Sequence, residues 1–266
     1  MYKNPNKPEI TQLSSSKQVS MSDEWYELTD FNHFWIKWRF IIAQKLLKPS
    51  LSTETKILEI GCGNGLVMWQ FEKGLGLIIE GCDLNLFALE NRLNISGKVF
   101  LYDIFDLHPN LLGKYDIVLL LDVLEHIDDD SVFLKTALEY LKPGGQIVVG
   151  VPAHQYLFSK YDLIVGHKRR YNSQQLNLLL KSANLVDVES RYWGFSLLPL
   201  ALLRKIHLKF LRDNKVIRNG FKPPHRFFNW VFIILMKIET TVFEKVTNGI
   251  SIIVIGRKPF NNYPEH

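Results

Sequence analysis

Apolar residues along this chain follow two spacings that alternate, and they predict strands and helices in turn. Continuous Val/Ile/Leu runs typical of buried strands are separated by stretches in which apolar residues recur every three or four positions, the spacing of a helix with one buried face. The predicted strands cover residues 56–60, 76–83, 98–102, 115–121, 146–151, 186–192 and 250–257, and the predicted helices cover 30–47, 66–73, 86–93, 128–141 and 173–183. Buried strands joined by helices form parallel sheets covered on both faces, which predicts an α/β fold.

Two segments interrupt this alternation. Residues 1–21 are polar and contain no apolar stretch of the kind found in secretory signals, which predicts a disordered lead-in. Residues 195–248 separate the last two strands and hold two apolar, basic helical patterns around the breakers Asn219-Gly220 and Pro223-Pro224. We therefore expect a Rossmann-like, doubly wound, mostly parallel seven-stranded sheet with an N-terminal helical segment and a helical insertion before the last strand.

The chain divides into four expected parts. Residues 1–21 form the lead-in, 22–50 an N-terminal helical cap, 51–194 with 249–260 an α/β core, and 195–248 a basic insertion that caps the substrate. The net charge of +5 is concentrated in this insertion, where residues 196–248 hold ten Lys/Arg against three Asp/Glu. Such a face suits phosphates, acidic lipid or nucleic acid, although a solvated helical surface explains the same pattern.

The cysteine content and the hydropathy indicate a cytoplasmic protein. Cys62 and Cys82 belong to no CxxC or Cys/His cluster, so neither a disulfide framework nor a zinc site is expected. No stretch reaches the roughly 18 to 20 apolar residues that span a bilayer. The apolar and cationic residues of the insertion are nevertheless typical of interfacial helices, so we also consider peripheral contact of residues 195–248 with the inner membrane.

A glycine-rich turn follows the first predicted strand of the core, where open α/β sheets bind ligands. Glycines at Gly61, Gly63 and Gly65 allow positive φ and close approach of the backbone to a ligand. Asp83 lies 22 residues after Gly61, at the end of the second core strand, where a carboxylate accepts hydrogen bonds from ribose hydroxyls. The acidic Glu59 beside the turn suits a cationic ligand.

Two nucleotide-like ligands fit this layout. A dinucleotide fold prefers a third Gly or Ala where this chain has Leu66, because pyrophosphate sits against the helix N-terminus. S-adenosyl-L-methionine has no phosphate and needs space for a charged amino acid and a sulfonium. The sequence therefore favours S-adenosyl-L-methionine over NAD.

Five ordered motifs resemble those of class I S-adenosylmethionine-dependent methyltransferases. They are Ile57-Leu-Glu-Ile-Gly-Cys-Gly-Asn-Gly65, Asp83, Asp103 with Ile104, Tyr115-Asp-Ile-Val-Leu-Leu-Leu-Asp-Val-Leu-Glu-His126, and Leu141-Lys-Pro-Gly-Gly145. The resemblance implies S-adenosyl-L-methionine as cofactor, S-adenosyl-L-homocysteine as product, and no metal. The cofactor-binding residues that it implies are Glu59, Gly61, Gly63, Gly65, Asp83, Leu84, Asp103, Ile104, Asp122 and His126.

A polar cluster follows the fifth core strand and belongs, by its place, to the acceptor side. Val151-Pro-Ala-His154 and Gly166-His-Lys-Arg-Arg-Tyr171 resemble a subgroup of bacterial methyltransferases found beside sugar and lipid-linked glycan enzymes. Either His154 or His167 is the expected general base, since imidazole accepts a proton near neutral pH. The expected substrate-binding residues are Tyr161, Asp162 and Tyr171, which would orient the acceptor, Arg169 and Arg170, which would bind an anion, and Trp35 and Trp38, as pocket residues or core.

These features predict a methyltransferase that moves a methyl group to an O or N atom of a small or lipid-linked molecule. Three other functions stay open at this point: a nucleic-acid methyltransferase, a non-catalytic S-adenosylmethionine-binding protein, and a nicotinamide oxidoreductase. No RNA-binding module and no Asn/Asp-Pro-Pro-aromatic motif is present, which disfavours nucleic acid. Residues 128–130 carry three aspartates, but helix capping explains them without a metal.

Overall fold

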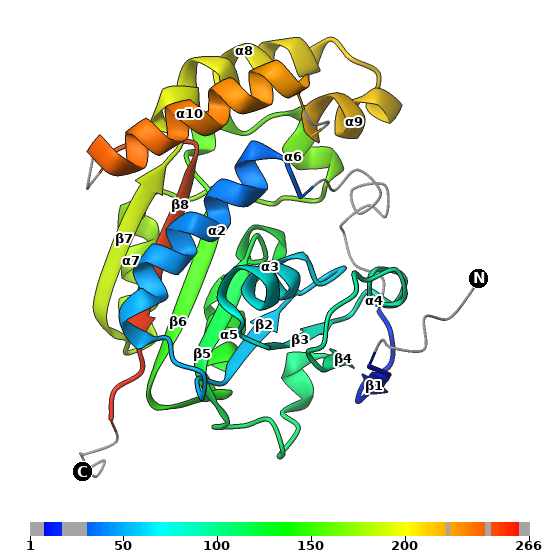
Figure 1. The fold of residues 1–266 in the computed structure, drawn as a ribbon, viewed down its shortest axis with the longest axis vertical. Coiled ribbons are helices and arrows are strands. Elements are labelled where there is room, and N and C mark those ends of the chain that lie inside the picture. Colours follow the sequence, from blue (N-terminus) through cyan, green and yellow to red (C-terminus); the bar gives the residue numbers. More distant parts are fainter. Residues whose placement is uncertain (1–7, 18–30, 222–223, 243–245, 261–266) are drawn as a thin grey trace.

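The computed structural model describes residues 8–17, 31–221, 224–242 and 246–260 (Figure 1). Its centre is one eight-stranded sheet in the order β1-β4-β3-β2-β5-β6-β8-β7. The strands are β1 (Ile10–Gln12), β2 (Ile57–Ile60), β3 (Glu80–Asp83), β4 (Val99–Leu101), β5 (Tyr115–Leu121), β6 (Leu141–Pro152), β7 (Val186–Trp193) and β8 (Ser251–Arg257).

The sheet is parallel except at one strand. β8 runs antiparallel to both of its neighbours, β6 and β7, while all other pairs are parallel. The carboxyl ends of β2 and β3 therefore lie at one edge, and so do those of β5 and β6. The Rossmann-like, mostly parallel fold expected from the sequence is confirmed, with one strand more than the seven predicted.

The additional strand comes from the segment predicted to be disordered. Ile10–Gln12 pairs with Val99–Leu101 as edge strand β1, so the prediction of a disordered lead-in is wrong for this part of residues 1–21. The residues that follow stay close to the sheet, because the backbone amides of Leu13 and Ser14 both donate to the carbonyl of Leu101, at 3.0 Å each. A three-residue strand carries too little pattern to be recognised in a polar sequence.

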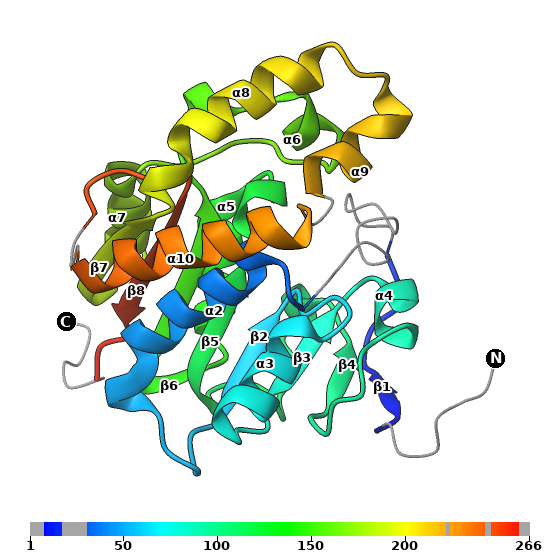
Figure 2. The ribbon, with the colours of Figure 1, turned by 45° about the horizontal axis from the view of Figure 1, so that its top comes forward.

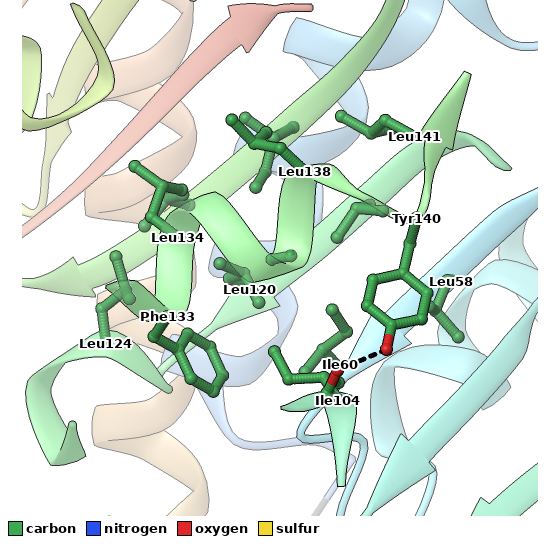
Figure 3. Close-up of a cluster of buried hydrophobic side chains, with 14 of the residues drawn as sticks. Leu58, Ile60, Ile104, Leu120, Leu124, Phe133, Leu134, Leu138, Tyr140 and Leu141 are labelled. Carbon is green, nitrogen blue, oxygen red and sulfur yellow. Dashed lines mark hydrogen bonds between the residues drawn. The ribbon is translucent and has the colours of Figure 1, made fainter. Parts of the chain in front are cut away.

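Helices cover both faces of the sheet. One face packs against α2 (Phe34–Leu47), α3 (Leu66–Leu75) and α4 (Leu86–Glu90), and the other packs against α5 (Asp130–Leu138) and α7 (Ser173–Ser182). Strand residues alternate between these faces, so that Val118 and Leu120 pack with α5 while Ile117 and Leu119 pack with α3. Figure 3 shows the core on the α5 side, with Leu120, Leu134 and Leu138 pointing toward one another.

Two boundaries differ from the prediction for local reasons. The helix predicted over 128–141 ends at Leu138, and Leu141 already pairs with Tyr115 as the start of β6. The strand predicted over 76–83 begins only at Glu80, because Gly76 caps α3 in the left-handed conformation and the Leu77 amide still bonds to that helix.

The insertion lies over the carboxyl ends of the strands. It contains α8 (Leu198–Lys209), α9 (Val216–Phe221) and α10 (Arg226–Val242), which stand above the sheet together with α6 (Lys160–Ile164) in Figures 1 and 2. Glu239 of α10 fixes the start of the insertion, since its buried carboxylate accepts hydrogen bonds from the amides of Gly194, Phe195 and Ser196.

A third apolar cluster joins the insertion to the core. It contains residues of α2, α3, α6, α8 and α9, namely Ile36, Leu66, Tyr161, Val165, Leu208, Val216 and Ile217. Across the described parts of the chain, none of the helices combines the length and the apolar character that a bilayer crossing requires. The apolar cluster makes the insertion a packed layer above the carboxyl ends of the strands.

Candidate functional site

The glycine turn after β2 has the backbone geometry that the sequence predicted. Gly61, Gly63 and Gly65 all have positive φ, of 77°, 52° and 75°, and Gly65 caps the N-terminus of α3. A Cβ on Gly61 would lie 2.6 Å from a methyl carbon of Val123, so the turn packs directly against the segment after β5. The turn therefore leaves its backbone close to any ligand at the carboxyl edge of β2 and β5.

Asp83 ties this turn to the end of β3. One carboxylate oxygen accepts a hydrogen bond from the Gly63 amide at 2.7 Å, and the other accepts from the Asn85 amide at 2.8 Å. Partial burial raises the pKa of the Asp83 carboxyl, while these two amides and that of Leu84 act in the opposite direction. Asp83 is thus held beside the turn, where the ribose of a nucleoside would lie.

Glu59 lies at the same edge and is 3 % exposed. Desolvation raises the pKa of its carboxyl from 4.5 to about 8, although the charge of Arg39 opposes this shift. Its Oε2 has no hydrogen-bond partner among the described residues. A carboxyl oxygen that lacks a partner beside a ligand turn is well suited to the cationic amino group of S-adenosyl-L-methionine.

We expect Glu59→Gln to become more stable relative to the wild type as the pH rises from about 5 to about 8. The folded state holds the Glu59 proton up to about pH 8, whereas the unfolded chain releases it near pH 4.5. Over this window the native state binds more protons, so rising pH costs the wild type stability that glutamine does not lose. Melting temperatures of the ligand-free proteins measure the difference, with Glu54→Gln as an exposed control. Parallel curves for both variants and wild type would contradict the burial of an ionisable Glu59.

The predicted adenine contacts have other partners in the structure. Asp103 forms an ion pair with Lys17, and its second oxygen accepts from the Phe105 amide at 3.1 Å. The Lys17 amide donates to the carbonyl of Leu84 at 3.4 Å. The segment after β1 therefore crosses the place where Leu84 and Asp103 would meet an adenine ring.

Ile104 is a core residue. Its side chain is 3 % exposed, and its carbonyl accepts a hydrogen bond from the Tyr140 hydroxyl at 2.5 Å (Figure 3). So buried a side chain offers little surface to a ligand. The contact of Ile104 with an adenine ring stays a prediction.

A cavity of about 540 Å³ opens beside the carboxyl ends of the strands, between the core and the insertion. At one end it is lined by polar residues that follow β5 and β6: Asp122, Glu125, Ser159, Tyr161, His167 and Arg170. Asp122 has a positive φ of 59° and pairs with Arg39 of α2. The volume of the cavity falls within the roughly 300–1,000 Å³ that is usual for sites of drug-sized ligands.

His167 and Asp162 form a dyad at the polar end of this cavity. The Nδ1 of His167 lies 2.9 Å from Oδ1 of Asp162, and its Nε2 lies 4.0 Å from the carboxylate of Glu125. Asp162 is fully buried and also accepts hydrogen bonds from Ser159 and Arg170. These donors, led by His167 and Arg170, overcome desolvation and hold the pKa of the Asp162 carboxyl below its usual range. Asp162 therefore stays ionised and orients His167.

Glu125 and His126 complete the group around His167. Glu125 is fully buried, neither of its carboxylate oxygens has a hydrogen-bond partner in the described part of the chain, and desolvation raises its pKa well above the usual value. Desolvation and the charge of His167 lower the pKa of His126 to about 3, and the two rings meet edge to face at 4.7 Å. A protonated Glu125 and a neutral His126 therefore surround the dyad.

Among the described residues, Glu125, His126 and His167 form a group that could share a metal ion. Their possible ligand atoms all lie within 4.8 Å of one another. Glutamate and histidine are usual ligands of divalent cations, and a cation bound here would have to displace the proton that burial favours on Glu125. The aspartates at 128–130 serve other purposes: Asp129 caps α5 by accepting from the Val132 amide at 3.0 Å, and Asp128 and Asp130 pair with Lys168 and Arg169. The group around His167 is therefore better suited to proton transfer.

His154 and Trp38 lie outside the cavity. His154, the other expected base, has a positive φ of 61° and is stacked between Tyr156 and Tyr192 at 5.0 and 5.1 Å. Trp38 is 1 % exposed and belongs to the core between α2 and the sheet, whereas Trp35 lines the cavity. Trp38 therefore takes the core position that the sequence offered as its alternative, and the role of His154 as base stays a prediction.

Three predicted acceptor contacts act elsewhere. Arg169 donates to the Asp128 carbonyl at 2.7 Å and pairs with Asp130. Tyr171 is 4 % exposed and donates to the Asp130 carboxylate at 2.7 Å. Asp162 does not line the cavity, since its oxygens are used by Ser159, His167 and Arg170. The acceptor contacts predicted for Arg169 and Tyr171 stay predictions, since neither side chain lines the cavity, and Asp162 acts through His167.

The structure adds three residues that the sequence did not single out. Arg39 pairs with Asp122, Glu125 faces His167, and Arg204 of α8 lines the cavity. Arg39 and Arg204 are cations within apolar helical stretches, which was their one visible signal. Glu125 lies within the motif that ends at His126, and its burial could not be read from the sequence.

Comparison with known proteins agrees with this geometry. A family model described as a methyltransferase domain matches residues 34–190. A ubiquinone biosynthesis O-methyltransferase of Thiobacillus denitrificans is 32 % identical over 101 residues, which are 35 % of this chain and 42 % of the relative. Phosphoethanolamine N-methyltransferase 1 of Arabidopsis thaliana is 26 % identical over 156 residues, 53 % of this chain and 30 % of the relative. The matches thus span less than half the length of these curated relatives.

Solved structures resemble this chain over most of its length. Haemonchus contortus phosphoethanolamine N-methyltransferase 2, in complex with S-adenosyl-L-methionine, superposes with a TM-score of 0.54 at 18 % identity, covering 86 % of this chain and 56 % of the other. A methyltransferase of Archaeoglobus fulgidus has a TM-score of 0.50 at 19 % identity, covering 85 % of this chain and 98 % of the other. These similarities show a shared fold. Because the family model matches more than half of its residues, the chain belongs to the methyltransferase domain family, as its motifs indicated.

Proposed function

We propose that this protein is an S-adenosylmethionine-dependent methyltransferase that methylates a small or lipid-linked molecule, at a hydroxyl oxygen. The observation that carries the proposal is the Asp162–His167 dyad at the polar end of the cavity, beside the edge that holds the glycine turn. A base is needed when the acceptor is a hydroxyl, and less so when it is an amine. The dyad therefore favours oxygen over nitrogen.

The residues at the carboxyl edge of the sheet fit the cofactor. Asp83 would hold the ribose hydroxyls, the turn from Gly61 to Gly65 would approach the amino acid part, and the buried carboxyl of Glu59 would meet its charged amino group. Binding of a cation beside Glu59 would favour the ionised carboxylate, so that the desolvated acid gains a partner. When bound, S-adenosyl-L-methionine supplies an electrophilic methyl carbon, which the acceptor oxygen attacks as sulfur leaves.

The dyad provides for the proton of the acceptor hydroxyl. His167 lines the cavity, and its Nε2 would accept this proton, while the Nδ1 proton remains in its hydrogen bond to Asp162. Arg170 and Ser159 fix the Asp162 carboxylate, so the imidazole keeps one orientation and one tautomer. Trp35 and Tyr161 line the same cavity and would exclude water from the reacting atoms.

The insertion supports a lipid-linked acceptor taken from an anionic membrane surface. Large apolar side chains of α8 and α10 remain more than half exposed, namely Leu203, Ile206, Phe227, Phe228, Trp230 and Ile238. The same segment carries the excess of positive charge, which attracts acidic lipid headgroups. An exposed apolar and basic face of this kind is typical of helices that lie in a membrane interface.

The names of the relatives support a small acceptor. One relative is named for ubiquinone biosynthesis and another for phosphoethanolamine, and both names denote small molecules. A nucleic-acid methyltransferase has no comparable support among these relatives.

The proposal predicts that S-adenosyl-L-methionine with a radioactive methyl group will label a lipid-soluble, non-protein molecule in a bacterial cell extract. The extract is separated into organic, aqueous, nucleic-acid and protein fractions after incubation with the full chain. Label in RNA or DNA would establish the nucleic-acid alternative instead. Binding of S-adenosyl-L-homocysteine without any labelled product would indicate a non-catalytic binding protein. In parallel, the protein should float with vesicles containing anionic lipid and remain behind with neutral ones, and equal recovery from both would exclude an electrostatic membrane contact.

A further inference from the structure

Arg204 is a cation without a visible partner inside the cavity. The other long cationic side chains that line the cavity are engaged: Arg170 is paired with Asp162, and Lys205 donates to the carbonyl of Tyr156 at 2.6 Å. Arg204 makes no hydrogen bond or ion pair with any residue that the structure describes, and its Nε is buried. This Nε has lost water without gaining an acceptor, which is unfavourable.

The surroundings of Arg204 hold its guanidinium in place without using its donors. Its guanidinium carbon lies 4.6 Å from the centre of the Tyr161 ring, in a cation–π contact. On another side, a Cβ at Gly220 would lie 2.9 Å from its Nη2, so the glycine provides the space that the guanidinium needs. Stacking engages the face of the guanidinium and leaves the donors at its edge available.

Several lining residues of the cavity are apolar. Leu200 and Ala201 come from the same helix, Phe232 comes from α10, and Ile250 precedes β8. The cavity therefore combines a proton-accepting group at His167, a fixed cation at Arg204 and an apolar wall. A ligand that matches all three has a nucleophilic hydroxyl, an anionic group and a hydrocarbon part.

We propose that Arg204 binds the phosphate or carboxylate of an amphipathic acceptor, whose hydrocarbon part lies against α8 and α10. The planar fork of arginine matches the two oxygens of such a group. The identity of this ligand as the methyl acceptor rests on the proposed function, but its binding does not. Arg204 thereby takes the role that the sequence suggested for Arg169 and Arg170.

Binding of three probes to the full chain, saturated with S-adenosyl-L-homocysteine, tests this assignment by calorimetry. The probes are decyl phosphate, the neutral decyl glucoside and inorganic phosphate, each below any micellar concentration. We expect Arg204→Gln to weaken decyl phosphate binding by about tenfold or more, the effect of losing a charge-assisted contact. Lys209→Gln, on the same helix but outside the cavity, removes the same charge and should leave binding unchanged.

Each outcome either tests the anion site or identifies the class of molecule that carries the anion. Equal binding of decyl phosphate and decyl glucoside to the wild type would overturn the anion site, and so would equal losses in Arg204→Gln and Lys209→Gln. Inorganic phosphate that binds as tightly as decyl phosphate, with the same loss in Arg204→Gln, would support the anion site and assign it to a water-soluble phosphate ester rather than a lipid.

A second variant separates binding from folding. Arg204→Lys keeps the charge but loses the planar fork and the stacking on Tyr161. We expect it to bind decyl phosphate more tightly than Arg204→Gln and less tightly than the wild type, with unchanged affinity for S-adenosyl-L-homocysteine. Wild-type decyl phosphate affinity in both folded variants would overturn the proposal. Because no methyl transfer is measured, failure here is distinct from failure to label an acceptor.

Discussion

Replacing His167 by alanine is expected to lower kcat for methyl transfer by about a hundredfold or more, the usual contribution of general base catalysis. His167 lines the cavity, and its Nδ1 is held by Asp162 at 2.9 Å. The affinity for S-adenosyl-L-homocysteine should stay the same, because His167 lies on the acceptor side of the site. Steady-state turnover of the labelled acceptor fraction and calorimetry with S-adenosyl-L-homocysteine measure the two quantities separately.

His154→Ala provides the matched control. This second histidine follows the same strand, but its ring is stacked between Tyr156 and Tyr192 and does not line the cavity. Its removal should lower the melting temperature and leave kcat close to the wild-type value. If His154→Ala loses as much activity as His167→Ala while remaining folded, or if His167→Ala keeps full turnover, the assignment of the base is wrong.

Replacing Asp83 by asparagine is expected to weaken S-adenosyl-L-homocysteine binding by about tenfold to a hundredfold. The loss corresponds to about 1 to 3 kcal/mol, the value of hydrogen bonds to a charged acceptor. Both carboxylate oxygens of Asp83 already accept backbone amides, from Gly63 and Asn85, so the side chain is oriented before any ligand arrives. Asparagine keeps the size of the side chain but replaces one acceptor with a donor, which opposes the Gly63 or the Asn85 amide. Calorimetric titration and the melting temperature of the ligand-free protein measure both effects.

Asp116→Asn is the control for this variant. Asp116 lies near the start of β5, where its carboxylate accepts from Lys142 and from the Lys56 amide. Loss of that carboxylate changes the net charge by the same amount, at the amino ends of the strands and away from Asp83. Unchanged affinity in Asp83→Asn, or an equal decrease in Asp116→Asn, would remove the ribose-binding role from Asp83.

The arrangement of the cofactor-binding residues could be predicted from the sequence because it depends on neighbouring parallel strands. Gly61 follows β2 and Asp83 ends β3, and Ile60 pairs with Cys82 in the parallel register of these strands. Two strand ends that are paired in this way must lie side by side, so the spacing of the motifs was enough to place them together. The ion pair of Asp103 with Lys17 could not be predicted in the same way, because it depends on edge strand β1.

The residues on the acceptor side could be predicted only in part from the sequence. His154 and His167 follow the same strand and have the same chemistry, and the sequence offered both as a base. Their environments separate them: two tyrosine rings enclose His154, while the buried Asp162 holds His167 at the cavity. Such a difference depends on which way a loop turns, and loop conformation is set by contacts with distant residues.

The sequence by itself therefore determined the fold, the family and the turn with its nearby acid, since each of these follows from local periodicity and from strand ends that lie adjacent in a parallel sheet. Only the tertiary structure decided which polar residues face the acceptor. Arg39 of α2, Glu125 after β5 and Arg204 of α8 are far apart in the chain, yet they line or support one cavity. Burial and partner choice at such positions are properties of the packed molecule, because they depend on side chains that no local pattern specifies.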